Sequence, residues 1–308
     1  MSLTILVIGC GSIGQRHIYN LITLGVKKIL VYDHVPEKSN EMESQYGVVS
    51  VSSLKSALDS SVDAVVICTP PIHHIDIARK AVEKGSNVFI EKPISYSLEG
   101  INELLMEAEQ KSLTVMVGYN LRFHSGLREA KYLIEKGTIG KLLAAHAEFG
   151  QYLPDWRPDR DYREGYFSDP NKGGGIIFDA SHEIDYLRWF IGEVNRVYAS
   201  AATLSDLDIS SEDFATIILK TKDNILATAR LDCIQRGYSR NCKFIGSHGT
   251  LIWDFVEGVK ILDDRGQVWK KLDINPDVNE MYIDEIDCFL GCISGKLDPP
   301  VDGRSGRR

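Results

Sequence analysis

The sequence predicts an α/β protein with two domains: an N-terminal doubly wound parallel sheet, and a C-terminal α+β domain with an open, mainly antiparallel sheet. Two observations predict the first domain. Apolar strands alternate with helices through the first 120 residues, and a Gly-x-Gly-x-x-Gly turn follows the first strand. A third observation predicts the second domain, because strand-like runs beyond residue 190 are joined by short turns.

The expected elements follow this rhythm in order. Strands are predicted at 3–8, 28–33, 48–51, 64–68, 87–91 and 114–119, with helices at about 12–24, 37–46, 53–59, 73–84 and 97–111. A helix at 125–136, a strand at 141–149, a polar and aromatic loop at 150–172 and a helix at about 175–190 follow. The last predicted strands are 196–204, 213–220, 225–232, 240–246, 249–254, 259–263 and 268–272, before a helix at 280–294. The expected domains are 1–120 and 121–298, with a tail at 299–308.

Composition narrows the class of protein. The chain has 308 residues, 44% of them hydrophobic, and a net charge of −8, which argues against a general nucleic-acid binder. No apolar run reaches the ~18 residues of a membrane helix, and no signal segment precedes the first strand, so a cytoplasmic location is expected. The six cysteines form no C-x-x-C pair and read as reduced thiols, and no metal site is predicted, although Cys288 and Cys292 share a helical face.

A glycine motif follows the first strand. Gly9, Gly11 and Gly14 permit, in turn, a tight turn, close approach of the backbone to a pyrophosphate, and packing of the helix on the strand. A helix that opens at Ser12 and Ile13 would point its free N–H groups at the phosphates. The strand, glycines, helix and second strand together predict a dinucleotide site rather than a structural turn.

Asp33 ends the second strand, about 20 residues further on, where a carboxylate can bind the adenosine ribose. That carboxylate would repel a 2′-phosphate, and residues 34–37 offer no arginine, so NAD(H) is favoured over NADP(H). Lys38 and a charged His34 keep NADP(H) open as an alternative. The structural alternative is a strand-end acid that faces water.

Two further segments follow strands, where ligands bind in a doubly wound sheet. Thr69, Pro70 and His74 lie beyond the fourth strand, in a rigid turn that could also be a plain connection. Glu91 and Lys92 end the fifth strand. Partial desolvation there would suit the lysine to proton transfer, and a charged strand end facing water is the alternative.

A third segment is the glycine-led helix at 175–190. Asp179 and His182 are three residues apart, so both are expected to project from one face of this helix. A carboxylate and an imidazole on one helix edge can bind and deprotonate a hydroxyl group. The alternative is an amphipathic helix with a capping acid and a satisfied histidine.

Together these segments resemble the Gfo/Idh/MocA oxidoreductases, the family of glucose–fructose oxidoreductase and inositol dehydrogenase. The marks run in the family's order over residues 3 to about 295: the glycine motif, Thr69-Pro-Pro with His74, Glu91-Lys-Pro93, Gly118-Tyr-Asn-Leu-Arg-Phe123 and the Asp179/His182 helix. The resemblance implies that NAD is the cofactor and that the second domain's open sheet forms a homodimer or homotetramer.

The resemblance also implies roles for particular residues. Lys92 would contact the substrate hydroxyl and assist proton transfer, His182 would be the general base, and Asp179 would position the substrate oxygen. Glu91 and Asn120 would lie near the nicotinamide. The other implied cofactor contacts are Gly9, Gly11, Ser12, Ile13, Gly14, Asp33, Thr69, Pro70 and His74.

The sequence departs from the family pattern in two places. Many members have three residues between the aspartate and the histidine, whereas only Ala180 and Ser181 intervene here, which makes the aspartate's role less secure. Members usually end in a long helix, whereas this sequence stops at Arg308, as a truncated chain or one with a foreign tail would.

The 150–172 loop is the expected source of substrate specificity. Flat rings suit sugar faces, and arginine forks suit carboxylates or phosphates. The expected substrate residues are Arg122, Trp156, Arg157, Tyr162 and Arg163. A sugar, sugar acid, polyol or nucleotide sugar is favoured, and a loop that only orders an oligomer contact is the alternative.

Three functions therefore stay open. The leading one is an NAD-dependent dehydrogenase that transfers hydride between nicotinamide and a hydroxyl carbon. The others are an NAD-assisted glycosidase without net redox change and a non-catalytic regulator that senses the dinucleotide.

Overall fold

In the computed structural model, the described residues are 3–263, 270–272 and 277–308. The chain divides into two compact units. Unit 1 comprises Met1–Asn120 and Tyr282–Arg308, and unit 2 comprises Leu121–Met281.

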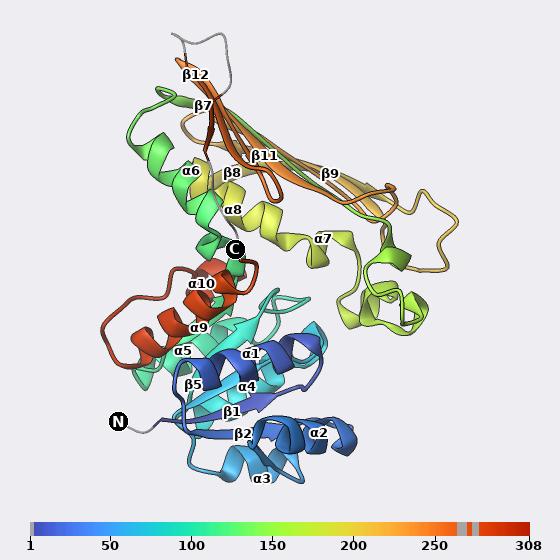
Figure 1. Cartoon of the computed structure of the whole chain (residues 1–308), viewed down its shortest axis with the longest axis vertical. Helices are drawn as coiled ribbons and strands as arrows, with labels where there is room; N and C mark the ends of the chain where they lie inside the picture. Colours follow the sequence, from blue (N-terminus) through green and yellow to red (C-terminus); the bar gives the residue numbers. More distant parts are fainter. Residues whose placement is uncertain (1–2, 264–269, 273–276) are drawn as a thin grey trace. The chain divides into compact units, whose positions relative to one another are not determined.

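Unit 1 is built on a six-stranded parallel sheet with the strand order β3-β2-β1-β4-β5-β6 (Figure 1). Its strands are β1 Thr4–Ile8, β2 Lys28–Tyr32, β3 Val49–Ser50, β4 Ala64–Ile67, β5 Asn87–Glu91 and β6 Val115–Gly118. Its helices include α1 Ser12–Thr23, α2 Pro36–Tyr46, α3 Leu54–Asp59, α4 His74–Glu83 and α5 Ile101–Gln110, with a 3₁₀ turn at Pro71–His73. This is the predicted doubly wound sheet, and its strand order reverses direction between β1 and β4, where ligands bind in such folds.

Helices cover both faces of this sheet. On one face, Leu6 and Ile8 of β1 join a buried cluster with Ala57 of α3 and Ala78 of α4. On the other face, the Phe89 ring lies 5.5 Å from the ring of Phe289. Burial on both sides explains why the strands are apolar at successive positions rather than at alternate ones.

The C-terminal segment from Tyr282 onwards belongs to unit 1, whereas residues up to 298 were expected in the second domain. Helices α9 Glu280–Ile293 and α10 Gly303–Arg307 lie in this segment. The N–H of Val117 in β6 donates to the carbonyl of Val301 at 2.9 Å. A Cβ at Gly303 would lie 2.2 Å from Leu105 Cδ2. The segment expected to be a tail is therefore an integral part of the Rossmann-type core.

Unit 2 contains an eight-stranded sheet with the order β14-β13-β12-β11-β7-β10-β9-β8. Its pairs are antiparallel except for β7 with β10, which run parallel. The strands are β7 Leu142–Gly150, β8 Val194–Ala202, β9 Phe214–Thr221, β10 Leu226–Asp232, β11 Ser239–Gly246, β12 Gly249–Asp254, β13 Gly258–Asp263 and β14 Lys270–Leu272. Residues 268 and 269 of the last predicted strand lie outside the described residues.

One face of this sheet is covered and the other is open. The helices α6 Ser125–Glu135, α7 Ile176–Asp179 and α8 Ser181–Ile191 lie on the covered face (Figure 1). Across it, Ala147, Cys242 and Trp253 are fully buried neighbours. On the open face, Ile218 is 38% exposed and Tyr198, paired with it, 59%.

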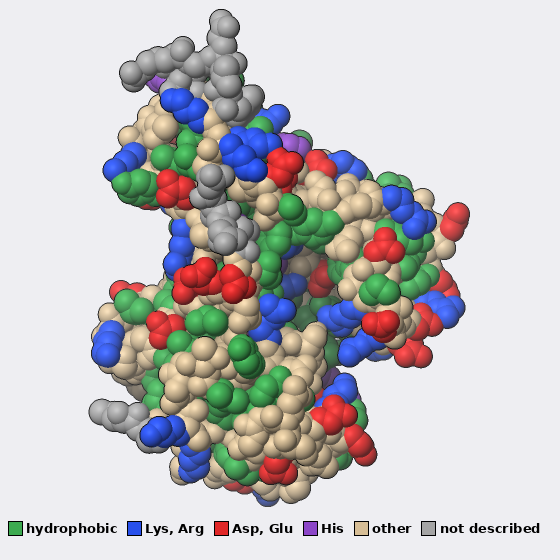
Figure 2. Space-filling model, viewed as in Figure 1, with side chains coloured by type: hydrophobic (Ala, Val, Ile, Leu, Met, Phe, Trp, Pro, Cys, Tyr) green, Lys and Arg blue, Asp and Glu red, His purple; other side chains and the backbone are tan. Residues whose placement is uncertain are grey.

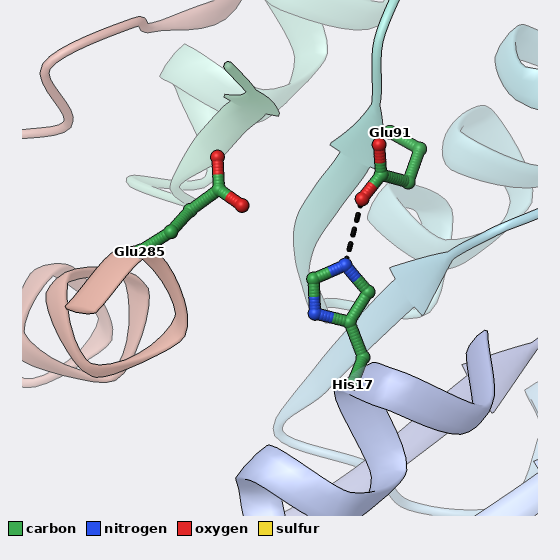
Figure 3. A group of neighbouring side chains, drawn as sticks. All are labelled: His17, Glu91 and Glu285. Atoms are coloured by element: carbon green, nitrogen blue, oxygen red, sulfur yellow. Dashed lines mark hydrogen bonds and ion pairs between the residues drawn. The ribbon is translucent and has the colours of Figure 1, made fainter. Parts of the chain in front are cut away.

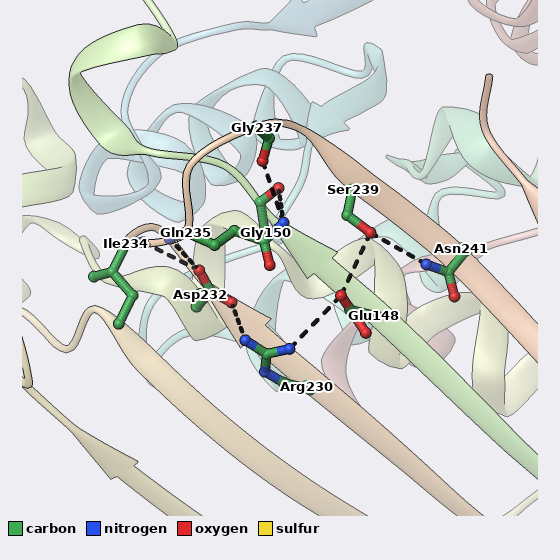
Figure 4. Close-up of polar contacts among 9 residues, drawn as sticks. All are labelled: Glu148, Gly150, Arg230, Asp232, Ile234, Gln235, Gly237, Ser239 and Asn241. Carbon is green, nitrogen blue, oxygen red and sulfur yellow. Dashed lines mark hydrogen bonds and ion pairs between the residues drawn. The ribbon is translucent and has the colours of Figure 1, made fainter.

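A polar network runs across the open face as well. Figure 4 shows the Arg230 guanidinium between Glu148 and Asp232, at 3.7 and 3.1 Å. Asp232 also accepts from the backbone N–H groups of Ile234 and Gln235. These bonds fix the turn that leads from β10 into β11.

Short 3₁₀ turns fill the loop between β7 and α7, at Leu153–Asp155, Tyr162–Glu164, Tyr166–Ser168 and Pro170–Lys172. Another 3₁₀ turn, Asn120–Phe123, precedes α6. On the face shown in Figure 2, basic and acidic side chains are interspersed rather than gathered into a basic patch. None of the helices in the described part of the chain is long and apolar enough to cross a membrane.

Candidate active site

The glycine loop of unit 1 is shaped by backbone contacts. Gly9 has φ +94°, and a Cβ there would lie 2.7 Å from the carbonyl oxygen of Cys68. A Cβ at Gly14 would lie 1.8 Å from the carbonyl oxygen of Gly9. Both glycines are therefore required by the fold itself, as the sequence predicts.

Gly11 differs from these two glycines. A Cβ there would meet no atom of the described structure within 4 Å. It is the N-cap of α1 and has no side-chain cap, and Ser12, the first residue of the helix, is exposed. The open space before the helix N-terminus fits a pyrophosphate, which such termini bind through their N–H groups.

The Asp33 carboxylate braces the same loop. It accepts from the N–H of Cys10 at 2.7 Å and from the N–H of Val35 at 2.9 Å, and its side chain is 5% exposed. The alternative of an acid facing water is therefore wrong. Burial, with Asp33 beside it, raises the pKa of the Cys10 thiol to about 12, so Cys10 stays protonated.

His74 lies inside the protein and joins two loops. Its ring nitrogens lie 2.7 Å from the carbonyl oxygen of Thr69 and 2.9 Å from that of Pro93. Burial lowers the pKa of His74, against the opposing effect of these carbonyls. The imidazole holds the turns after β4 and β5 together, whereas Pro70 beside it is exposed.

Glu91 is held by a buried histidine that the sequence analysis did not single out. Figure 3 shows Glu91 paired with His17 of α1, whose Nε2 lies 2.7 Å from Oε1, while Glu285 of α9 projects toward the pair. The ligand-type atoms of the three side chains lie within 4.8 Å of one another. The N–H of Lys92 donates to the other oxygen of Glu91 at 3.2 Å. The cluster fixes the end of β5, where Lys92 begins the next turn.

In unit 2, the expected single helix at 175–190 is wrong, because it is divided at Ala180. Asp179 ends α7, whereas His182 is the second residue of α8, and Ala180 between them has φ −93° and ψ 29°. The N–H groups of Ile176 and Ile177 donate to the backbone and side chain of Glu212. The start of α7 is thus tied to a residue far along the chain, which a local pattern cannot reveal.

Two buried ion pairs fix α8. Glu183 accepts from Arg240 of β11 at 2.9 and 3.3 Å, and Asp185 accepts from Arg122 at 2.8 Å on each oxygen. Burial raises the pKa of Asp185, while Arg122 acts to lower it. Arg122, which was expected to bind substrate, therefore directs its Nε and Nη2 donors at Asp185 of α8. His182, 9% exposed, lies beside these anchored positions.

Of the loop residues expected to bind substrate, Trp156 is packed within the loop, whereas Arg157 and Arg163 are exposed. Trp156 donates from Nε1 to the carbonyl of Gln151 and packs edge to face on Phe149 and Phe167. Arg163 is 56% exposed and forms a two-pronged pair with Asp161, whose carboxylate it keeps at a pKa of about 2. Tyr162 accepts from the N–H of Asp208 through its hydroxyl at 3.3 Å, and Arg157 is exposed.

Sequence reasoning missed Tyr166, whose hydroxyl donates to Asp179 Oδ1 at 2.6 Å. Three other residues that were not predicted, His17, Glu183 and Glu285, are fully buried polar side chains, and the partner of Glu183, Arg240, is largely buried. Nothing in the local sequence pattern indicates this burial.

A glycine-cradled helix N-terminus at a parallel-sheet switch point, with a half-buried acid and a buried imidazole in a second unit, is typical of a dinucleotide-binding enzyme of the Rossmann class. Two family models match the chain: "Oxidoreductase family, NAD-binding Rossmann fold" over residues 3–119, and "GFO/IDH/MocA C-terminal domain" over residues 127–252. The chain belongs to the Gfo/Idh/MocA oxidoreductase family and carries its NAD-binding domain.

Individual relatives agree with this assignment. The chain is 27% identical to a myo-inositol 2-dehydrogenase of Thermotoga maritima, over 98% of this chain and 91% of the relative. It is 26% identical to the scyllo-inositol 2-dehydrogenase (NAD(+)) of Bacillus subtilis, over 96% and 87%. The structure of a levoglucosan dehydrogenase in complex with NADH shares the fold, with a TM-score of 0.90, 20% identity, and coverage of 100% of this chain and 94% of that one.

Proposed function

We propose that the protein is an NAD-dependent dehydrogenase that oxidises a CH–OH group of a sugar, sugar acid, polyol or nucleotide sugar. The observation that carries this proposal is the pairing, in one chain, of an NAD-type glycine cradle with the half-buried Asp179 and the buried His182 of unit 2. The inositol dehydrogenases among its relatives support a polyhydroxylated substrate.

The cofactor would be held by unit 1. The N–H groups of Ser12 and Ile13 would bind its pyrophosphate over Gly11, between the packing glycines Gly9 and Gly14. Asp33 would bind the adenosine ribose, and Thr69, Pro70, Glu91 and Asn120 would line the path toward the nicotinamide. His74 would act indirectly, by holding the Thr69 turn. NAD⁺, when bound, accepts the hydride.

Proton transfer would fall to this chain's own side chains. His182 would take the proton of the substrate hydroxyl, Asp179 would position that oxygen, and Lys92 would hold the same hydroxyl and assist the transfer. Holding the reacting groups in the correct positions relative to one another supplies much of the rate enhancement. Trp156, Tyr162, Arg157 and Arg163 remain candidates for specificity, although Arg163 would have to exchange part of its contact with Asp161 for a substrate anion. Arg122 would act through α8.

Asp33 supports a preference for NAD(H). Its carboxylate already lies at the loop, where a 2′-phosphate would bring a second negative charge beside it. We expect calorimetric titration to show tighter binding of NAD(H) than of NADP(H). The substitution Asp33→Ala should reduce the ratio of the two dissociation constants by about tenfold. Tighter binding of NADP(H) by the wild type would refute this role.

A substrate screen tests the activity directly. The protein is incubated with NAD⁺ and a panel of inositols, sugars, sugar acids, nucleotide sugars and glycosides, and NADH absorbance and glycoside cleavage are followed together. A dehydrogenase forms NADH in proportion to product. Cleavage without net NADH would indicate an NAD-assisted glycosidase, and NAD binding without either reaction would indicate a regulator.

We also propose that the open face of the eight-stranded sheet forms a homodimer or homotetramer interface. It presents exposed apolar side chains, including Ile218 and Ile245 on β9 and β11, whose opposite face is largely buried, and Tyr198 on the exposed strand β8. Light scattering should give a mass of two or four chains, and Ile218→Lys should reduce it. A monomeric wild type would refute the proposal.

A further inference from the structure

The loop between β7 and α7 contacts the Asp179–His182 segment through the side chain of Tyr166. The hydroxyl of Tyr166 lies 2.6 Å from Asp179 Oδ1, a short distance typical of an O–H donor on a carboxylate. In this bond the phenol donates and the carboxylate accepts. Such charge-assisted bonds are about twice as strong as neutral ones and favour one orientation of the carboxylate.

The backbone around this contact is built to place the phenol there. The N–H of Gly175 donates to the carbonyl of Phe167 at 3.1 Å, and the N–H of Gly174 donates to that of Asp169. A Cβ at Gly174 would lie 2.3 Å from the carbonyl oxygens of both Tyr166 and Phe167. The glycine run therefore lets the Tyr166–Phe167 peptide lie directly against the start of α7.

The same turn is held from its other side. Ser211 donates through its hydroxyl to the carbonyl of Phe167 at 2.6 Å, and the Phe167 ring is buried against Trp156. Tyr166 therefore has little freedom to leave Asp179 unless this whole turn moves. The aspartate itself ends a one-turn helix, and one turn offers its side chain little support of its own.

We propose that Tyr166 is a positioning residue for Asp179: its phenol holds the carboxylate in the orientation that receives the substrate hydroxyl. This inference rests on the proposed function. It also explains how the Asp179–Ala180–Ser181–His182 spacing, shorter than in many members of the family, supports a working aspartate. A carboxylate offers about four lone-pair sites, so one phenol leaves it the capacity to accept from a substrate as well.

The test compares Tyr166→Phe with Tyr132→Phe, a matched loss of a phenol hydroxyl from helix α6, where Tyr132 is 49% exposed. Turnover is measured with myo-inositol, or with whichever panel compound the wild type oxidises. We expect Tyr166→Phe to lower kcat about tenfold to a hundredfold, with NAD⁺ affinity within about twofold of the wild type. The control variant Tyr132→Phe should stay within about twofold of the wild type in both kcat and NAD⁺ affinity.

A double-mutant cycle and a structure complete the test. Adding Tyr166→Phe to Asp179→Asn should cause little further loss, since the two residues act as a unit. Crystal structures of the wild type and of Tyr166→Phe should show Asp179 in different rotamers, whether or not a substrate has been found. Full activity of Tyr166→Phe beside an active wild type, or an unchanged Asp179 rotamer, would overturn the inference. A wild type without turnover would refute only the proposed function.

Discussion

The glycine loop of unit 1 and the Asp179–His182 segment of unit 2 are held in place by different kinds of contact. In unit 1 the cradle consists of main-chain groups, and its shape depends on which positions lack a side chain, as Gly9 and Gly14 show. In unit 2 the Asp179–His182 segment is held by side-chain pairs between residues that are far apart in the sequence, such as Glu183 and Arg240, which are 57 positions apart. Local backbone sites can be recognised from residue order, whereas a site held by distant pairs becomes visible only in three dimensions.

The largest expected effect tests the pairs of unit 2. Arg240→Met would leave Glu183, whose side chain is fully buried, without its cation. Removal of one partner of a buried ion pair costs about 3–5 kcal/mol of unfolding free energy. Because all four tryptophans lie within residues 121–281, tryptophan fluorescence in urea reports on unit 2. Arg163→Met, in an exposed pair, is the control and should change little. Equal losses of unfolding free energy in the two variants would show that the Glu183–Arg240 pair stabilises unit 2 no more than the exposed Asp161–Arg163 pair does.

A second substitution pair sharpens the account of unit 1. Gly14→Ala should lower the unfolding free energy by roughly 3 kcal/mol, because its Cβ would overlap the Gly9 carbonyl. Gly11→Ala should leave stability within about 0.5 kcal/mol but weaken NAD⁺ binding about tenfold or more, because only the ligand needs that space. Circular dichroism and calorimetry measure the two quantities separately. Unweakened NAD⁺ binding by Gly11→Ala would show that this glycine has no role toward the ligand.

The third prediction concerns the loss of unfolding free energy of unit 2 at acid pH. Burial, together with nearby Arg240, lowers the pKa of His124 to about 4, against about 6.5 in an unfolded chain. Since the pKa of His124 is lower in the folded state, the full unfolding free energy is present above pH 6.5. Part of it is lost as the pH falls toward 4. Between pH 6.5 and 5 the loss should be about 2 kcal/mol.

The control for this prediction is His124→Asn, which keeps an acceptor for the N–H of Gly126 but does not titrate. The difference between wild type and variant in urea unfolding isolates the histidine from other groups. Parallel pH dependences of the two proteins would contradict the assignment.

This contrast explains what could be predicted from the sequence. The parallel sheet, the glycine cradle and Asp33 each follow from neighbouring residues and strand order. The division of the Asp179–His182 helix could not be foreseen, because it depends on Glu212 and on the turn at Tyr166. The packing of the C-terminal segment on unit 1 could not be foreseen either, since the Val301 carbonyl lies far along the chain from its partner Val117 in β6. The mainly antiparallel second sheet was predicted because its strand-like runs alternate in part and are joined by short turns.

The central claim is that unit 1 binds the cofactor while His182 of unit 2 performs the proton transfer. The most direct test measures turnover and NAD⁺ affinity together in His182→Ala, with Lys92→Ala as its counterpart from unit 1. We expect each substitution to lower turnover by about 10²–10⁴, typical of losing a general acid or base, and to leave the calorimetric Kd for NAD⁺ within about twofold. Near-normal turnover in both variants, or a Kd for NAD⁺ that weakens in step with turnover, would contradict this division of labour.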